Sequence, residues 1–465
     1  MSLFSNLEKF SSKVCIIDEN KNEYKYKDLL LQVKKLEKHI NKRSIVFLIC
    51  KNEYEFVISY VTLIRTKAVF FLISKTIAKK KLINLINQYK PEFIFSPIEK
   101  EINIYNFKKI YQIKDKYNLF KKNKKNYFKP SKDLALLIST SGSTGTPKFV
   151  KLSYENIYDN TKKIVKFLKI KSSDRPITTM EPSYSYAISI LNSHLHVGAS
   201  IIMTEKSLFE KNFWELFKSK KSTTFGGVPF IYSILKKINF EKLKLPSLKY
   251  MTQAGGNLNN LFILDFLRIC KKKKIKLFIM YGQTEASPRM SILDWKQIYK
   301  KLGSIGKPLS GGNFFLYNDK KKIISKNNTE GELVYTGKNV MLGYAENIND
   351  IKKNEVNSRL FTGDLAKRDK DGFYYITGRK SRFIKIYGTR CSLDEIEKEI
   401  NSFDIECACT GKDDNLKFFI TNKDKTKFII KYVKKNFQIN KVNLSFSVIL
   451  KIPRSENGKV LYNQL

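Results

Sequence analysis

Short apolar runs separated by polar turns divide the first part of the chain into alternating strands and helices. Residues 44–49 and 68–73 are continuous apolar runs, the pattern of strands that are buried on both faces. Apolar residues at helical spacing lie between and after them, at 56–64 and 82–86. This β-α-β alternation predicts a parallel sheet covered by helices. Residues 107–132 are lysine-rich and poorly patterned, so we expect them to form a surface connection.

Later apolar runs end in polar turns. The runs 134–138 and 149–152 predict two strands, and a loop rich in hydroxyl groups joins them. A strand near 250–253 leads into Gly255 and Gly256, and the run 277–280 leads into Tyr281-Gly282-Gln283-Thr284-Glu285. Ligands of open α/β sheets bind beyond the carboxyl ends of the strands. We therefore expect these turns to assemble one site.

The pattern changes to short strands with glycine turns after Gly303, which predicts a smaller β-rich subdomain. Further on, Ser392 and Glu395 have the spacing of a capping box that opens a helix.

Composition places the chain among globular proteins and leaves its charge to be explained. The chain has 465 residues, 42% hydrophobic, enough for two or three domains and a large core. With 87 Lys and Arg against 43 Asp and Glu, the net charge is +44. The lysines are spread from end to end, and Asn, Ile, Tyr and Phe are also abundant, so compositional drift is favoured over nucleic-acid binding. A basic nucleic-acid-binding protein remains an alternative, and a basic surface would also attract an acidic partner.

Targeting and redox signals are few. The N-terminus has no clean apolar core with a cleavage site, and Arg65 and Lys67 interrupt the longest apolar stretch, 54–73. We therefore expect no signal peptide and no transmembrane segment. The six cysteines are scattered, which indicates reduced thiols in a cytoplasmic protein. His194 and His196 lack a third ligand at suitable spacing, so packed histidines are favoured over a metal site.

The loop between the two predicted strands has the chemistry of a phosphate site. Its N–H and O–H donors suit phosphate oxygens, glycines allow close approach, and Lys148 adds a point charge. It is not the common P-loop, because Pro147 precedes the lysine and a strand, not a helix, follows. The candidate phosphate-binding residues are Thr140, Ser141, Gly142, Ser143, Thr144, Gly145 and Lys148.

This loop resembles the phosphate-binding loop of the acyl-adenylate-forming ligases, which include acyl-CoA synthetases, peptide-synthetase adenylation domains and luciferase. The turn 281–285, the Thr-Gly-Asp ending at Asp364, Arg379 and the terminal Gly458-Lys459 follow in the family's order. Phe149 stands where a glycine is frequent, and Ser381 where the family's hinge usually has Asp or Lys.

The resemblance implies an α/β fold. It implies a large N-terminal domain, residues 1–380, of parallel-type sheets packed with helices and a β-rich subdomain at about 303–380. A small, mobile α+β C-terminal domain, residues 381–465, would carry the catalytic lysine.

The resemblance also implies ATP and Mg²⁺ as cofactors and gives roles to residues. Glu285 would hold Mg²⁺, which prefers one or two carboxylates plus phosphates. Thr284 and Lys148 would contact phosphates, Asp364 and Arg379 the ribose or phosphate, and Lys459 the carboxylate and α-phosphate as charge builds. The other residues expected at the nucleotide are Gly255, Gly256, Tyr281, Gly282, Gln283 and Lys385.

The implied activity is that of an AMP-forming acid–thiol ligase. A carboxylic acid becomes an acyl-adenylate with release of pyrophosphate, and its acyl group then passes to coenzyme A or to carrier-protein phosphopantetheine. An acidic acyl carrier protein is a candidate partner, and fatty acid metabolism a candidate context. The alternative within the family is a degenerate homologue that binds nucleotide without turnover.

The expected acyl pocket is aromatic or small and uncharged. Amino-acid-activating relatives have Phe-Asp-x-Ser where this chain has Tyr186-Ala187-Ile188-Ser189, so the aspartate that pairs with a substrate ammonium is absent. We therefore expect a neutral-tailed acyl or aryl acid and not an α-amino acid. The residues expected to line the pocket are Tyr184, Tyr186, Ala187, Phe225, Ala254 and Gly255.

Overall fold

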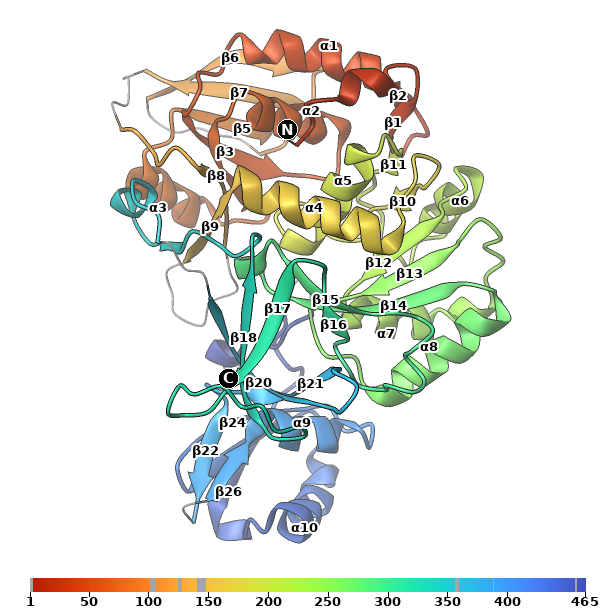
Figure 1. Ribbon diagram of the computed structural model, residues 1–465, viewed down its shortest axis with the longest axis vertical. Coiled ribbons are helices and arrows are strands. Elements are labelled where there is room, and N and C mark those ends of the chain that lie inside the picture. The colour runs from red at the N-terminus through yellow and green to blue at the C-terminus, as the bar shows by residue number, and fades with distance from the viewer. Residues whose placement is uncertain are drawn as a thin grey trace.

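The computed structural model describes residues 3–100, 106–123, 128–139, 148–355, 359–387, 389–455 and 458–465. Within these ranges the chain forms two large sheets with helices, then a smaller antiparallel sheet, and then a terminal unit, from top to bottom in Figure 1.

The first large sheet, at the upper left of Figure 1, has a parallel centre and antiparallel edges. Strands β8, β4, β3 and β5 run parallel, while β19, β9, β7 and β6 pair antiparallel with their neighbours. The strand order is β19 (Tyr344–Ala345), β9 (Phe149–Ser153), β8 (Leu134–Ser139), β4 (Val69–Ser74), β3 (Ile45–Cys50), β5 (Phe93–Pro97), β7 (Tyr117–Lys122) and β6 (Phe107–Ile113).

The hairpin β6–β7 corrects the expectation of a surface connection at 107–132. Ile113, Tyr117 and Leu119 are buried, whereas Lys108 and Lys109 point to solvent on the edge strand. Lysines on an edge strand hinder pairing with another chain. The same lysines hid the strand pattern from sequence reasoning.

The second large sheet repeats this plan. The central strands β14, β13, β12, β10, β11 and β1 run parallel to one another, and β15, β16 and β2 add antiparallel edges. The order is β16 (Lys307–Pro308), β15 (Arg289–Leu293), β14 (Lys276–Gly282), β13 (Tyr250–Gln253), β12 (Thr224–Gly227), β10 (Pro176–Ile177), β11 (Ile201–Ile202), β1 (Val14–Ile17) and β2 (Glu23–Lys25).

Helices cover both large sheets. Ser153 caps α4: its Oγ accepts a hydrogen bond from the backbone N–H of Asn156 at 2.9 Å. The helices of this part of the chain are α1 (Tyr26–Glu37), α2 (Tyr54–Arg65), α3 (Lys79–Tyr89), α4 (Tyr154–Leu168), α5 (Ser185–His196), α6 (Lys211–Ser219), α7 (Pro229–Lys237) and α8 (Asn260–Lys272). None of the helices in the described ranges is long and apolar enough to cross a bilayer.

The smaller sheet and the terminal unit complete the chain. The sheet runs β17 (Gly312–Tyr317), β18 (Gly331–Gly337), β20 (Leu360–Arg368) and β21 (Tyr374–Arg379). The terminal unit has a hydrophobic cluster of its own, from Ile384 to Ile439. Its elements are β22 (Phe383–Ile386), β23 (Thr389–Ser392), α9 (Leu393–Asn401), β24 (Cys407–Lys412), β25 (Asn415–Ile420), α10 (Thr426–Phe437) and β26 (Leu444–Val448). The predicted boundary at 380/381 stays a prediction.

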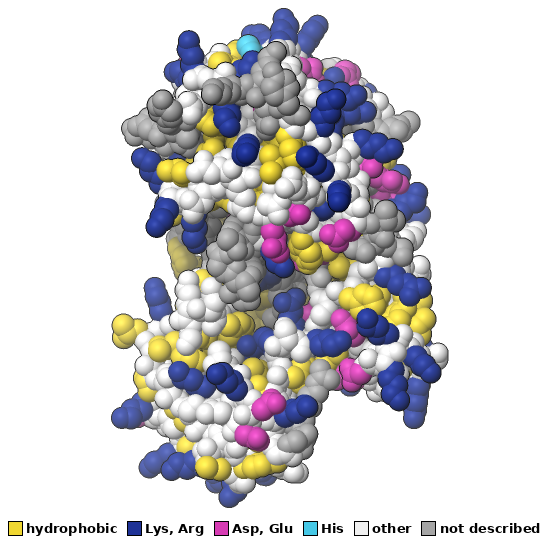
Figure 2. All heavy atoms as spheres, turned by 90° about the vertical axis from the view of Figure 1, so that its left-hand side faces the viewer, with side chains coloured by type: hydrophobic (Ala, Val, Ile, Leu, Met, Phe, Trp, Pro, Cys, Tyr) yellow, Lys and Arg dark blue, Asp and Glu magenta, His cyan; other side chains and the backbone are white. Residues whose placement is uncertain are grey.

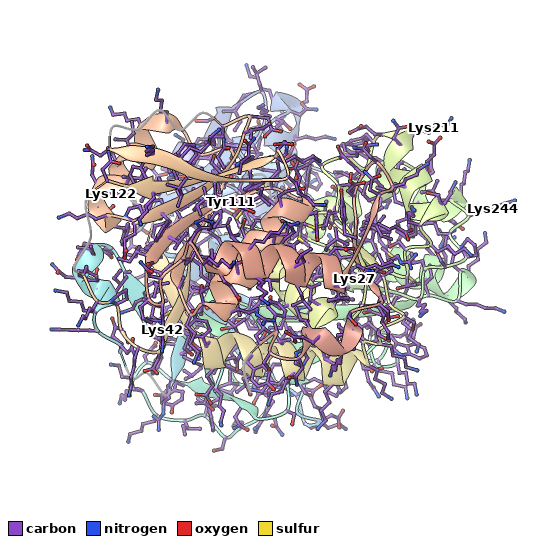
Figure 3. All side chains as sticks on the ribbon, turned by 90° about the horizontal axis from the view of Figure 1, so that it is seen from above. Lys27, Lys42, Tyr111, Lys122, Lys211 and Lys244 are labelled. Atoms are coloured by element: carbon purple, nitrogen blue, oxygen red, sulfur yellow. The ribbon has the colours of Figure 1, made fainter. Side chains whose placement is uncertain are left out.

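The basic side chains are dispersed over the surface. Figure 2 shows Lys and Arg from top to bottom of one face, interleaved with acidic and apolar groups. Seen from above, Lys42 and Lys122 lie on one side of the molecule, and Lys211 and Lys244 on the opposite side (Figure 3). On the described parts of these views, the positive charge does not gather into one stripe.

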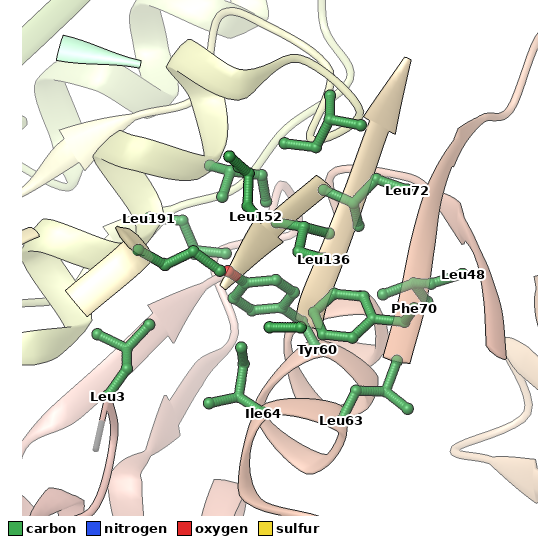
Figure 4. Packing of buried hydrophobic residues seen from close by; sticks show 14 of the residues in the cluster. Leu3, Leu48, Tyr60, Leu63, Ile64, Phe70, Leu72, Leu136, Leu152 and Leu191 are labelled. Carbon is green, nitrogen blue, oxygen red and sulfur yellow. The ribbon is translucent and has the colours of Figure 1, made fainter. Parts of the chain in front are cut away.

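The main core lies where helices meet the first sheet. Side chains of β3 alternate between two cores: Leu48 faces α2, and Phe47 faces the opposite side with α3. Tyr60 of α2 packs beside Phe70 (Figure 4). Its hydroxyl donates to Asn192 Oδ1 of α5 at 3.0 Å. This bond connects the core of the first sheet to the helix that carries the expected acyl pocket.

Candidate active site

Three neighbouring parallel strands of the second sheet bring the predicted turns to one edge. Gly227 of β12 pairs with Gln253 of β13, and Gln253 pairs with Ile279 of β14. The residues that follow these strands therefore emerge side by side, as expected for an open α/β sheet. Gly255 has φ +83°, and a Cβ there would lie 2.4 Å from the hydroxyl of Tyr184. The glycine turn and Tyr184 are thus in contact.

Asp364 is the centre of a polar cluster between two sheets. Its Oδ2 accepts from the Tyr281 hydroxyl at 2.5 Å and from Gln283 Nε2 at 3.1 Å, and its Oδ1 accepts from Arg379 Nε at 2.8 Å. Asp364 and Arg379 are direct partners across β20 and β21. Burial, and then the Asp364 carboxylate, raise the pKa of Tyr281 well above its ordinary value, so the phenol stays protonated.

Glu285 is held by one side-chain contact and one backbone contact, and neither of them involves its Oε2. Its Oε1 accepts from the Tyr344 hydroxyl at 2.9 Å, and its carbonyl accepts from the N–H of Met341 at 2.9 Å. Next to it, the hydroxyl of Thr284 lies 3.0 Å from Ser185 Oγ of α5. A carboxylate with one oxygen outside these contacts fits the ligand preference of Mg²⁺.

Lys459 reaches this site from the end of the chain. Desolvation by the surrounding protein, and then the Arg379 charge, lower the pKa of Lys459, while Glu285 and Asp364 act to raise it. Part of its side chain still reaches solvent. Gly458, at φ +75°, lets the terminal turn approach α7 closely, because a Cβ there would lie 2.3 Å from Phe230 Cβ. The structure thus brings a residue of the terminal unit to the turns of the second sheet.

Lys148 lies near Tyr344, a neighbour of Glu285. Its Nζ is 2.7 Å from Glu346 Oε1 and 5.8 Å from the ring centroid of Tyr344, the residue that donates to Glu285. The rest of the predicted phosphate loop, Thr140, Ser141, Gly142, Ser143, Thr144 and Gly145, lies outside the described residues. Lys385 is not part of this cluster: its side chain is exposed on β22, and its N–H donates to Asp413 Oδ1 at 2.8 Å.

The expected pocket residues lie along α5 and the facing strands. Tyr186 is buried, and its hydroxyl lies 2.7 Å from Thr252 Oγ1 of β13. Phe225 and Ala254 belong to the same hydrophobic cluster, against which Tyr184 and Ala187 are packed. Burial raises the pKa of Tyr184 to about 12, so its hydroxyl is neutral. His194 is buried on α5, and its Nδ1 lies 2.8 Å from the carbonyl of Ile190, as expected for a packed histidine.

Sequence reasoning missed three residues beside these groups. Ser185 and Tyr344 contact Thr284 and Glu285, but nothing in their local sequence marks them. Arg289 is buried, and its Cζ lies 5.0 Å from the ring centroid of Tyr186. Its only signal in the sequence is a charge at the start of the apolar run that forms β15. Arg289 thus adds a positive charge beside Tyr186, one of the residues expected to line the acyl pocket.

Comparison with known proteins assigns the family. The model of a family described as AMP-binding enzyme matches residues 3–345. The chain belongs to this family. A 2-succinylbenzoate–CoA ligase of Listeria innocua is 25% identical over 340 residues, 71% of this chain and 69% of that relative. An oxalate–CoA ligase of Saccharomyces cerevisiae is 26% identical over 348 residues, covering 72% of this chain and 63% of the relative.

Solved structures of AMP-binding enzymes have the same fold. An o-succinylbenzoate CoA synthetase from Bacillus subtilis, in complex with its acyl-adenylate intermediate, matches with a TM-score of 0.81 at 19% identity. That match covers 100% of this chain and 98% of the other. McyG A-PCP with phenylalanyl-adenylate matches with a TM-score of 0.77 at 20% identity, covering 100% and 82%. The predicted α/β fold class is confirmed.

These findings confirm the predicted superfamily and, at the level of the family, the predicted activity. The chain is an enzyme of the AMP-forming acid–thiol ligase type, and its matched relatives are named CoA ligases. They do not support the expected link to fatty acid metabolism. The individual site residues stay predictions, which the geometry above makes specific.

Proposed function

We propose that this enzyme activates a small carboxylic acid with ATP and passes the acyl group to coenzyme A. The observation that supports this most directly is that Gly458 packs the terminal turn against Phe230 of α7, where the charges of Arg379, Glu285 and Asp364 act on Lys459. In the first step the acid's carboxylate attacks the α-phosphate, forming the acyl-adenylate and releasing pyrophosphate. In the second step the thiolate attacks the acyl carbon, forming the thioester and releasing AMP.

The chain's own residues lower the main barrier of the first step, which is the approach of two anions. Lys459 supplies positive charge at the reacting oxygens, and Thr284 supplies a hydroxyl donor that Ser185 orients at 3.0 Å. Asp364 accepts hydrogen bonds from the ribose hydroxyls, with its orientation set by Tyr281 and Arg379. Mg²⁺ held by Glu285 supplies charge neutralisation on the phosphates when it is bound.

Coenzyme A is the favoured acceptor because the matched relatives are named CoA ligases. A carrier-protein phosphopantetheine has the same thiol chemistry, and the net charge of +44 would attract an acidic carrier. We also propose a cytoplasmic location, as the scattered cysteines of the sequence predict.

The test is acid-dependent exchange of labelled pyrophosphate into ATP with the full chain and a panel of acids. Exchange with at least one acid, followed by thioester formation on adding coenzyme A, is expected. A parallel reaction with an acidic holo-carrier protein decides between the two acceptors. Nucleotide binding without exchange for any acid would refute the proposal and favour the degenerate homologue.

A further inference from the structure

Arg289 has a buried guanidinium without a carboxylate partner. Its side chain is 3% exposed; Nε donates to Ser189 Oγ at 3.1 Å, and Nη1 lies 3.3 Å from Met280 Sδ. Across the part of the chain that the structure describes, no Asp or Glu forms an ion pair with it. The partly buried Arg382, by contrast, contacts both Asp394 and Glu397.

The buried positive charge of Arg289 would be stabilised by a negatively charged partner. Arginine is not deprotonated in proteins, so the guanidinium is positive although burial lowers the pKa of Arg289. A hydroxyl, a thioether and the ring of Tyr186 accept weakly and carry no negative charge. Buried charges are ordinarily paired, because an unpaired one is costly to remove from water. A ligand that brings a negative charge would remove this cost.

The position of Arg289 identifies which ligand that is. Its backbone is opposite Gly282 in the pairing of β15 with β14, at the turn expected to hold the nucleotide. Its side chain extends toward α5, where it contacts Ser189 and the face of Tyr186. Tyr186 belongs to the expected wall of the acyl pocket, and Ser185, on the same helix, contacts Thr284. The guanidinium therefore lies beside a residue of the expected acyl pocket.

We propose that Arg289 is the specificity-determining residue of the acyl pocket and pairs with a second carboxylate on the substrate. The inference rests on the proposed function and narrows its substrate to dicarboxylic acids: one carboxylate is activated at Lys459, and the other binds Arg289. Ser189 occupies Nε and Met280 Sδ takes one N–H of Nη1, which leaves the other Nη donors to bind a carboxylate, the acceptor that fits a guanidinium best. The acid is then not the neutral-tailed one that the sequence predicts.

The first experiment compares matched acids with the wild-type chain. Pyrophosphate exchange is measured with hexanoate against adipate and with benzoate against phthalate, with succinate and 2-succinylbenzoate added to vary length and shape. We expect at least one diacid to exceed every monocarboxylic acid by on the order of 10²-fold or more in kcat/KM, because a site built around a buried polar group rejects analogues that leave it unpaired. Equal or better activity with the monocarboxylic acids would overturn the inference but not the proposed function.

The second experiment uses variants of Arg289. Arg289→Met keeps much of the volume and removes the charge, so we expect a raised KM for the diacid, a smaller change in kcat, an unchanged KM for ATP and a loss of diacid selectivity. Arg289→Lys keeps the charge without the planar fork and should retain part of the selectivity. The control is Arg268→Met. Arg268 is an exposed arginine of α8 that pairs with Glu241, and its replacement should change none of these values.

A structural role for Arg289 would give different results. It would lower the melting temperature of the unliganded Arg289→Met protein and leave acid selectivity in the surviving fraction unchanged, which would refute the inference. We expect instead an equal or higher melting temperature, since an uncompensated charge is removed, together with loss of the thermal stabilisation that the diacid gives to wild type. If Arg289→Met does not fold, the wild-type acid panel and Arg289→Lys still decide. If no acid supports exchange or thermal stabilisation, both this inference and the proposed function fail.

Discussion

Lys459→Ala is the change that tests the site most directly. Among the cations of the site, Lys148 is paired with Glu346 at 2.7 Å and Arg379 with Asp364 at 2.8 Å. Lys459 forms no ion pair within the described ranges, so its charge is available to the reacting oxygens. Removing one such stabiliser costs roughly 10²–10³ in rate, about 3–4 kcal/mol. We expect that loss in adenylate formation.

The assay separates the two half-reactions of this variant. Pyrophosphate exchange reports the first, and thioester formation from a supplied acyl-adenylate and coenzyme A reports the second. We expect Lys459→Ala to lose the first and keep the second, while Lys451→Ala, an exposed lysine of the same terminal segment, keeps both. Exchange within a few-fold of wild type would refute the assignment of Lys459.

The pH dependence gives an independent check on Lys459. Its surroundings lower its pKa, so in the free enzyme the charged form is lost at a pH below the ordinary lysine value of 10.5. Acid-dependent kcat/KM for exchange should therefore fall on the alkaline side before pH 10.5, and this limb should be absent from the residual activity of Lys459→Ala. A wild-type alkaline limb that persists unchanged in the variant would assign it to another group.

Three further changes test other parts of the structure. Gly255→Ala places a Cβ 2.4 Å from the Tyr184 hydroxyl at φ +83°, so we expect acid-dependent exchange to fall at least tenfold, with partial recovery when Tyr184→Phe is added; no recovery would mean that backbone strain alone is responsible. Arg382→Met removes the cation that contacts Asp394 and Glu397 and should destabilise the terminal unit by about 3–5 kcal/mol in urea unfolding. Because burial already raises the pKa of Glu397, this loss should shrink at acidic pH, where the carboxyl is protonated in the folded protein; a loss independent of pH would contradict the assigned cause. Ser381→Pro fixes φ at the predicted hinge and should stop thioester formation while sparing exchange; equal loss of both half-reactions would argue against a hinge there.

The sequence predicts those elements and contacts whose pattern lies in consecutive residues, and misses those that depend on residues far apart in the chain. Buried parallel strands such as β3 and β4 are continuous apolar runs, so their positions follow from composition along the chain. The hairpin β6–β7 was missed because an edge strand exposes one side and fills it with lysine. The cluster around Asp364 was predictable as a set because its members lie in motifs with a fixed order. The contact of Tyr344 with Glu285, and that of Arg289 with Tyr186, depend on how distant strands are placed, and no local pattern encodes them.

The terminal unit brings Lys459, and not Lys385, to the site. We expect this arrangement to serve the first half-reaction and a different arrangement of the unit to serve the second. Lys459 is in the site because Gly458 lets the terminal turn lie against Phe230, whereas Lys385 is exposed on β22. Both residues follow Arg379, whose side chain is fixed to Asp364 on the large-domain side. The short segment between Arg379 and β22 is therefore the place where a change of backbone angles could withdraw Lys459 and present Lys385. If such a change replaces Lys459 with Lys385 for the second half-reaction, Lys385→Ala should slow thioester formation and leave pyrophosphate exchange unchanged. Slower exchange in Lys385→Ala would place both lysines in one conformation and remove the need for a rotation.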